Sequence, residues 1–251
     1  MNKERNLLKL LKDDQCLIAF KEAIINASDH LESSKAIAEI GKYGIAISHL
    51  VLGTEEIIKG FLLRLQSIGI NLRNIPSIHL YFTDHIIRHK LAVHLNLLYT
   101  LIEPILEAAA KMKEQLNNPE TEIEYTEKEK ALISKDEKQI QILFKGLPEM
   151  LDWWDQANMK KNSGFYVDYS DKLETPMQIN KEEYLLAYTI TDNFIIQMKN
   201  IFSYIDIQSK DELKQIAEYS KTSPILDPIK SLIEARKLEK RNLTENNINF
   251  S

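Results

Sequence analysis

The chain has 251 residues, of which 44% are hydrophobic and 27% are charged, and its formal net charge at pH 7 is −5. This balance excludes a protein that binds nucleic acid through an overall excess of positive charge, although it allows a local basic patch. The single cysteine, Cys16, excludes a disulfide framework within the chain, which is typical of a reducing compartment. No apolar run is long enough to predict a signal peptide or a membrane span. We therefore expect a cytoplasmic protein that does not enter a membrane.

Long helices are the predicted secondary structure, because only 7 glycines and 7 prolines punctuate the chain. The predicted helices, in chain order, cover about residues 13–41, 43–69, 77–116, 127–145, 149–164, 181–205, 210–220 and 228–240. Pro104 should kink the third of these helices. A short loop joins the second and third helices, so we expect them to pack antiparallel. The predicted fold class is an all-α, antiparallel helical bundle.

The segments between the helices differ in composition. Residues 117–130 are acidic and poor in hydrophobic side chains, and we interpret them as an exposed insertion. Residues 164–177 begin with an aromatic, alternating pattern and end in turn residues, which predicts a short extended, β-like arm. We expect a helical domain over 1–207, a C-terminal helical extension over 208–241 and a disordered tail over 242–251.

The side chains with the most chemistry lie in the second and third predicted helices. Glu55 and Glu56 interrupt an apolar helical pattern, and Lys59 follows three residues after Glu56. Four of the 6 histidines fall within residues 79–94. A helix that only packs against its neighbours has no need of this chemistry. These two segments are therefore the candidate functional site.

Three motifs follow one another along the chain. They are Gly41-Lys42-Tyr43-Gly44-Ile45-Ala46 with Glu55-Glu56-Ile57-Ile58-Lys59, then His89-Lys90, and then Gly164-Phe165-Tyr166-Val167-Asp168-Tyr169 with Pro176 after it. In this order they resemble the motifs of the AbiV family of abortive-infection proteins, which belongs to the wider HEPN group of helical domains. The resemblance covers roughly residues 14–205. One departure is Ala92, which stands where the family often has a second lysine.

The resemblance implies a HEPN-like helical bundle that forms a homodimer and acts in bacterial defence against phage. Infection, for example through a phage-encoded trigger protein, would lead to an arrest of growth or translation. Many HEPN domains are metal-independent ribonucleases with an R-x(4–6)-H motif at the dimer interface, so the resemblance implies RNA as substrate and no cofactor or metal. Other HEPN domains only bind partners. The alternative is therefore a non-catalytic defence protein that binds a phage or host protein.

Arg88 and His94 fit the R-x5-H form of this motif, and residues 73–79 fit it as well. Arginine can hold a phosphate, and histidine can take or give a proton near neutral pH, so RNA cleavage would need no metal. On an ideal helix Arg88 and His94 point about 120° apart, whereas His85 and His89 share a face. The catalytic candidates are Arg88, His94, His89 and His85. We expect Arg88 and His94 to lie on the helix surface, where truncation costs little stability.

Supporting roles follow from position. One of the two glutamates should face the third helix, pair with Arg88 or His89 and orient the imidazole. The supporting candidates are Glu55, Glu56, Lys59, Lys90, Tyr166 and Asp168. Two alternatives stay open. The cluster could be a solvated helix face with a weak Glu56–Lys59 ion pair, or His85 and His89 could bind a metal together with a glutamate.

Overall fold

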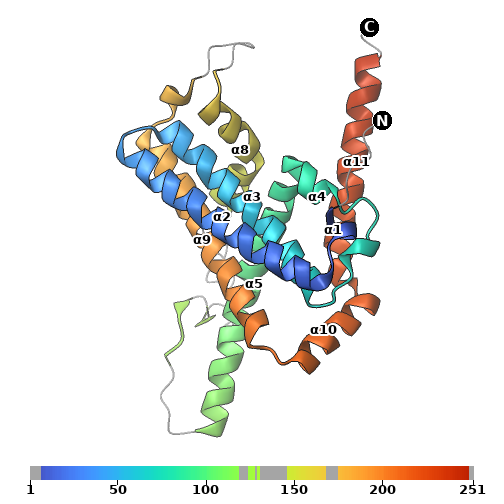
Figure 1. The fold of residues 1–251 in the computed structure, drawn as a ribbon. Coiled ribbons are helices and arrows are strands. Elements are labelled where there is room, and N and C mark those ends of the chain that lie inside the picture. The colour runs from blue at the N-terminus through green and yellow to red at the C-terminus, as the bar shows by residue number, and fades with distance from the viewer. Residues whose placement is uncertain (1–6, 119–123, 128, 131–145, 168–174, 249–251) are drawn as a thin grey trace. The chain divides into compact units, whose positions relative to one another are not determined.

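The computed structural model describes residues 7–118, 124–127, 129–130, 146–167 and 175–248, and helices are the regular secondary structure of these residues (Figure 1). The α-helices are α1 (Leu7–Leu10), α2 (Asp13–Glu39), α3 (Tyr43–Ser67), α4 (Leu80–Thr83), α5 (His85–Asn117), α8 (Leu147–Phe165), α9 (Lys181–Ile207), α10 (Lys210–Thr222) and α11 (Asp227–Ile248). Short 3-10 turns are η1 (Leu72–Asn74), η2 (Pro176–Gln178) and η3 (Pro224–Leu226). The predicted all-α helical bundle is confirmed.

The chain forms two compact units. Residues 1–92 and 154–251 make up the first unit, and residues 93–153 make up the second. Helix α5 begins in the first unit and continues through Pro104 in the second. The site described below lies wholly within the first unit.

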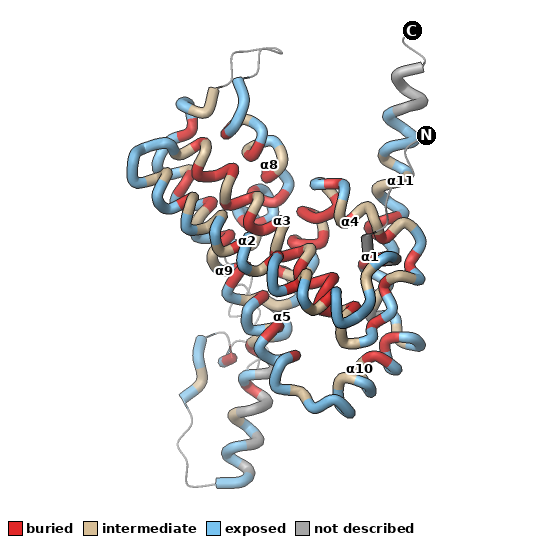
Figure 2. Tube along the Cα trace, in the orientation of Figure 1, coloured by how far each residue is buried: buried red, intermediate tan, exposed pale blue. Residues whose placement is uncertain are grey.

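Helices α2 and α3 form the central antiparallel pair of the first unit. Gly53 faces Ala27 and Gly60 faces Ile24, so higher residue numbers on α3 meet lower numbers on α2. A Cβ atom on Gly53 would lie 3.2 Å from the carbonyl oxygen of Ala27, which shows how closely the two backbones approach. Helix α9 also packs on α3, and much of α3 is buried (Figure 2). The most buried helix of the unit therefore carries Glu55.

The region predicted as one helix over 77–116 is divided at Asp84. Helix α4 ends at Thr83, Asp84 has an extended backbone (φ −117°, ψ 115°), and α5 begins at His85. The Asp84 side chain accepts a hydrogen bond from the backbone N–H of Ile86 (3.0 Å), as a helix-capping residue does. The prediction of an unbroken helix was wrong at this point. The apolar pattern continues across the break and so does not reveal it.

The segment 77–116, which we expected to pack antiparallel with residues 43–69, is divided between the two compact units. Only residues 77–92 of this segment belong to the same compact unit as α3, and residues 93–117 belong to the other unit. Within the first unit, the long helices that pack on α3 are α2 and α9.

The structure also bears on the predicted arm, insertion and tail. Helix α8 continues through Phe165, so the first two residues of the predicted arm are helical, and residues 168–174 lie outside the described residues.

Within the acidic segment 117–130, Glu129 accepts a hydrogen bond from Lys111 of α5 (2.6 Å). Helix α11 reaches Ile248, so a helix occupies much of the segment predicted as a disordered tail. Most of the predicted helix 127–145 lies outside the described residues.

Among the helices that the structure describes, none carries an apolar stretch long enough to span a lipid bilayer.

Candidate functional site

A buried carboxylate from the middle of α3 is the centre of the candidate site. Only 2% of the Glu55 side chain is exposed. Its Oε2 atom lies 2.7 Å from Nη2 of Arg88 and 2.6 Å from Nδ1 of His85. Its Oε1 atom lies 3.1 Å from Nε2 of His89 and 3.0 Å from Nζ of Lys161. We call these five residues the Glu55 cluster.

The first turns of α5 supply three members of the Glu55 cluster. His85, Arg88 and His89 occupy positions i, i+3 and i+4, which share one face of a helix. The break at Asp84 makes His85 the first residue of α5. Arg88 is fixed a second time, because its Nη1 atom donates to the backbone oxygen of Tyr81 (3.2 Å). Local helix periodicity therefore places one arginine and two histidines on the same carboxylate.

Lys161 reaches the cluster from α8, at a close crossing of α8 over α3. The hydroxyl of Ser48 donates to the backbone oxygen of Lys161 (2.7 Å). A Cβ atom on Gly164 would lie 2.1 Å from Oγ of Ser48 and 2.2 Å from the backbone oxygen of Gly44. No side chain fits at Gly164 without moving one helix. The crossing thus sets the position of the lysine at the cluster.

Replacing Gly164 with alanine should force α8 away from α3. We expect a loss of about 1–3 kcal/mol of unfolding free energy, as overpacking of a close contact costs. The exposed neighbour Asn162 provides the matched control, and Asn162→Ala should change stability by no more than about 0.5 kcal/mol. Urea denaturation measures both variants. Equal stability of the two variants would contradict the close crossing.

Electrostatics keeps Glu55 ionised. Burial raises the pKa of its carboxyl group, but the hydrogen bond from His89 and the charges of Arg88 and Lys161 outweigh burial and hold the pKa well below its ordinary value. One carboxylate therefore faces the guanidinium of Arg88 and the amino group of Lys161, and by formal charge these three groups carry an excess of +1. This excess favours an anion next to the cluster.

His85 is the most solvent-accessible member of the cluster. Its side chain is 48% exposed, compared with 2% for Arg88 and 7% for Lys161. Burial lowers the pKa of His85, and the charges of Arg88 and Lys161 lower it further, whereas Glu55 raises it; the net direction is down. The imidazole is therefore neutral at pH 7. Nδ1 of His85 lies within hydrogen-bonding distance of Oε2 of Glu55 (2.6 Å) and also of two donors, Nη2 of Arg88 (2.6 Å) and Nζ of Lys161 (2.9 Å). In the tautomer that donates Nδ1–H to Glu55, the lone pair is on Nε2, where it can accept a proton.

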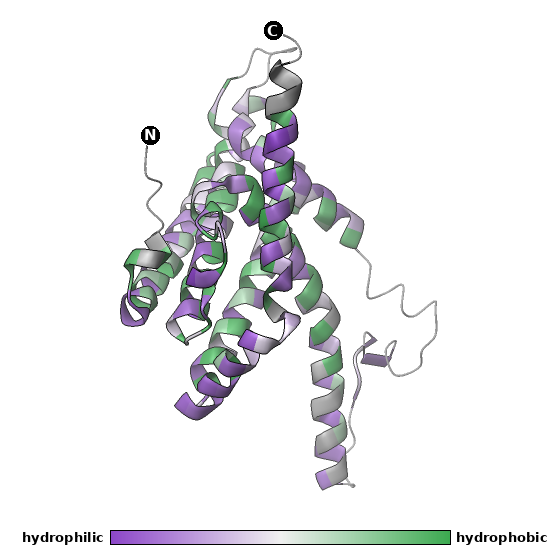
Figure 3. Cartoon of the chain, turned by 90° about the vertical axis from the view of Figure 1, so that its right-hand side faces the viewer, coloured by the Kyte–Doolittle hydropathy of each residue, from purple (hydrophilic) through white to green (hydrophobic). Residues whose placement is uncertain are grey.

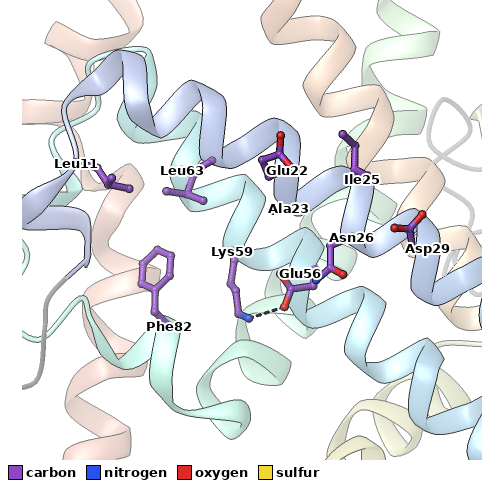
Figure 4. Close-up of a pocket in the computed structure, with 11 residues that line it drawn as sticks. Leu11, Glu22, Ala23, Ile25, Asn26, Asp29, Glu56, Lys59, Leu63 and Phe82 are labelled. Atoms are coloured by element: carbon purple, nitrogen blue, oxygen red, sulfur yellow. Dashed lines mark hydrogen bonds and ion pairs between the residues drawn. The ribbon is translucent and has the colours of Figure 1, made fainter.

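Glu55, and not its neighbour, is the glutamate that faces α5. Glu56 pairs with Lys59 at 2.5 Å on another side of α3. This pair borders a groove of about 690 Å³ between α2, α3 and α4 (Figure 4). Figure 4 shows Glu22 and Asp29 of α2 along the same groove and Phe82 of α4 at its other side. Glu56 and Lys59 are thus separated from the Glu55 cluster, although they neighbour it in sequence.

The structure does not place Arg88 on the surface, which corrects a prediction. The arginine is almost completely buried because both of its terminal nitrogens are bonded inside the protein, to Glu55 and to Tyr81. His89 is also buried, with 5% of its side chain exposed. His94 is exposed, and it belongs to the second compact unit. The R-x5-H match therefore combines a buried residue with an exposed one.

Arg73, the arginine of the second R-x5-H match at residues 73–79, has a structural role. Arg73 donates to the backbone oxygens of Leu8 and Leu11, and it forms an ion pair with Asp13 (2.9 Å). It thereby ties η1 to the junction of α1 and α2. This arginine is already used to hold the N-terminal segment.

The remaining supporting candidates lie apart from the Glu55 cluster or outside the described residues. Lys90 pairs with Glu239 of α11. Tyr166 is 67% exposed, and its ring lies 6.3 Å from that of Phe165. Asp168 lies outside the described residues.

The alternative of a metal bound by His85 and His89 meets an electrostatic obstacle. Both histidines do contact Glu55, as such a site would require. The same carboxylate is already bonded to Arg88 and Lys161, whose charges would repel a metal cation. Over the described parts of the chain, no three His, Cys, Asp or Glu side chains are grouped so that they could hold a metal.

Lys161 is the member of the cluster that sequence reasoning missed. It lies 106 positions from Glu55, so no local pattern links the two residues. The nearest signal is Gly164, which belongs to the third family motif and lies one helical turn after Lys161. A glycine inside a helix often marks a place where another helix packs closely. The residue one turn away, here Lys161, then faces the same helix, here α3.

The all-α helical fold is the one that the sequence led us to expect of a HEPN-like domain. The HEPN_AbiV family model, described as AbiV, matches residues 15–196. The chain therefore belongs to the AbiV family. All five residues of the Glu55 cluster lie within the matched part, and α10 and α11 lie after it. A search of curated proteins gave no match, and neither did a search of solved structures.

Proposed function

We propose that this AbiV-family protein acts in abortive infection as a metal-independent, HEPN-type ribonuclease in which His85 is the acid–base group. The observation that carries the proposal is the half-exposed imidazole of His85, held through Nδ1 by a buried, ionised glutamate. A fixed Nδ1 and an open Nε2 are what a general base requires. The glutamate orients the ring and stabilises the imidazolium that forms when the ring takes a proton.

The reaction that fits this site is cleavage of RNA beside a 2′-hydroxyl. Nε2 of His85 removes the hydroxyl proton, and the 2′-oxygen forms a bond to the adjacent phosphorus. The bond from phosphorus to the 5′-oxygen breaks, and an acid protonates that oxygen. The products are a 2′,3′-cyclic phosphate and a 5′-hydroxyl. In a homodimer, which we propose as the active form, the acid is a second copy of His85 in its protonated form, which is the minor form at pH 7 because the pKa of His85 is lowered.

Arg88 and Lys161 act on this reaction mainly through their charge. They are 2% and 7% exposed, so they are too deeply buried to hold a phosphate directly while Glu55 binds them. The charged nitrogens of both residues lie close to the His85 ring. Nη2 of Arg88 is 2.6 Å from Nδ1 of His85, and Nζ of Lys161 is 2.9 Å from the same atom. A positive field at this place stabilises the charge that develops on a phosphate in the transition state.

The second candidate is a non-catalytic defence protein that acts by binding a phage or host protein. One observation favours it. Arg88, the residue that the R-x5-H motif assigns to the phosphate, is bonded inside the protein through both terminal nitrogens, to Glu55 and to Tyr81. If Arg88 and Lys161 serve only to stabilise the fold through Glu55, the cluster would hold a binding surface rigid and would not catalyse a reaction.

Expression in bacteria challenged with phage separates these two functions. We expect the wild-type protein to stop phage propagation and to cause fragmentation of total RNA, with 2′,3′-cyclic phosphate ends. His85→Ala, at equal protein abundance, should lose both effects. Protection by the wild-type protein with intact RNA would contradict the ribonuclease and support the binding function.

A further inference from the structure

Helix α11 lies after the part of the chain that the AbiV model matches, yet it binds the start of α5. Oδ2 of Asp84 accepts hydrogen bonds from Nε of Arg236 (2.9 Å) and from Nζ of Lys240 (2.8 Å). Arg236 also donates through Nη1 to Glu239 (3.1 Å), and Glu239 pairs with Lys90. Side chains of α11 are therefore bonded on both sides of His85, at residue 84 and at residue 90.

An apolar contact fixes α11 in this place. Helix α11 is mostly hydrophilic (Figure 3), but Ile229, Leu232 and Ile233 are buried. The backbone oxygen of Ile229 accepts a hydrogen bond from the hydroxyl of Tyr81 (3.0 Å), a residue with no exposed surface. The first turns of α11 are thus packed against α4, and the next turn carries the residues that bind Asp84.

Asp84 and Tyr81, which α11 binds, are themselves bonded to the first turns of α5. Asp84 uses its other oxygen, Oδ1, to cap α5 through the N–H of Ile86 (3.0 Å). The backbone oxygen of Tyr81 accepts from Arg88 (3.2 Å), which in turn holds Glu55. Two short chains of hydrogen bonds therefore connect α11 to the Glu55 cluster.

We propose that α11 is a brace for the functional site and that Arg236 is its positioning residue, which fixes His85 against Glu55 through the Asp84 cap. This inference rests on the proposed function for its effect on RNA cleavage. It extends the functional part of the protein beyond the matched residues 15–196. Arg236 suits this role, because its guanidinium binds Asp84 and Glu239 at the same time and only 12% of its side chain is exposed.

The ion pairs of Asp84 with Arg236 and Lys240 persist over the whole physiological pH range. Burial raises the pKa of Asp84, but the hydrogen bonds from Lys240 and Arg236 and their charges outweigh it and lower the pKa to about 2. Asp84 is therefore ionised at neutral pH. Losing Arg236 would leave this carboxylate with Lys240, whose side chain is 50% exposed, and would free the first turn of α5. His85 would then move away from the buried cluster into solvent, where its pKa returns to the ordinary value.

The test uses the full-length protein and compares Arg236→Ala with Lys230→Ala. Lys230 lies on the same helix and forms only an exposed pair with Asp227, so it provides the matched control. NMR titration follows the His85 ring, which is assigned by its absence in His85→Gln. We expect Arg236→Ala to move the titration midpoint of His85 upwards, towards about 6.5. RNA cleavage should fall by about 10- to 100-fold, as a small displacement of a catalytic group can cost. Lys230→Ala should match the wild type in both readouts.

Two further variants complete the test. Arg236→Lys keeps the positive charge, but a lysine lacks the guanidinium that binds Asp84 and Glu239 at the same time. The titration midpoint of His85 in this variant should therefore lie between those of the wild type and Arg236→Ala. Lys240→Ala removes an exposed partner and should shift the midpoint less in the same direction, so it serves if Arg236→Ala does not fold. An unchanged His85 midpoint in folded Arg236→Ala and Lys240→Ala would overturn the brace. A shifted midpoint in a protein that cleaves no RNA would uphold the brace and overturn the ribonuclease.

Discussion

Replacement of Glu55 by glutamine is expected to destabilise the protein by about 3–5 kcal/mol, the usual cost of removing one partner from a buried ion pair. The variant keeps the shape of the side chain but leaves Arg88 and Lys161 buried without a countercharge. Glu56→Gln is the matched control, because Glu56 is the next residue and forms a partly exposed pair with Lys59. That change should cost no more than about 1 kcal/mol.

Urea denaturation of both variants at pH 7 measures this difference. A similar unfolding free energy for Glu55→Gln and Glu56→Gln would show that the Glu55 cluster does not stabilise the fold.

The same residue predicts a dependence of stability on pH. Because the folded-state pKa of Glu55 lies below its ordinary value, its contribution is fully present above the unfolded pKa of about 4.3. It is lost as the pH falls below that value, towards the folded-state pKa. The wild-type protein should therefore lose stability in acid more steeply than Glu55→Gln does. Thermal unfolding at a series of pH values from 7 downwards compares the two, and parallel curves would contradict the depressed pKa.

Truncation of Arg88 to alanine should also destabilise the protein by about 3–5 kcal/mol, because it removes a buried partner from Glu55. This expectation replaces the one from sequence, in which Arg88 lay on the surface. Lys59→Ala removes a cation from the partly exposed Glu56–Lys59 pair of α3, in which 26% of the Lys59 side chain is exposed, and should cost no more than about 1 kcal/mol.

Thermal unfolding of both variants decides the point, and an Arg88→Ala protein as stable as Lys59→Ala would contradict the buried position. A consequence concerns function. Loss of activity in Arg88→Ala would reflect damage to the fold as well as to the site, so this variant does not identify a catalytic residue.

The sequence predicted the contacts within the first turns of α5 because they follow helix periodicity. His85 and His89 share a face, and a glutamate near position 55 was expected to meet that face. Which glutamate would do so depends on the rotation of α3, and this rotation is set by packing against α2 and α9. The choice of Glu55 over Glu56 therefore needed the tertiary structure.

Other parts of the site left no local signal. The break at Asp84 interrupts an apolar pattern that reads as one continuous helix, and the capping bond of Asp84 is visible only once the chain turns there. The burial of Arg88 depends on a buried partner on another helix, whereas an arginine alone predicts exposure. Lys161 and Arg236 reach the site from helices far along the chain. Such long-range contacts are fixed by packing and not by residue spacing.

The rate of RNA cleavage by purified protein in the presence of EDTA tests the central claim most directly. The wild-type protein should cleave RNA under these conditions, because the proposed acid–base chemistry needs no metal. His85→Ala should fold normally, since this side chain is half-exposed, and should lose about 10²- to 10⁴-fold in rate, as the removal of a general base does. His79→Ala, in the second R-x5-H match, should cleave at the wild-type rate. Cleavage by folded His85→Ala at the wild-type rate would contradict the assignment of His85.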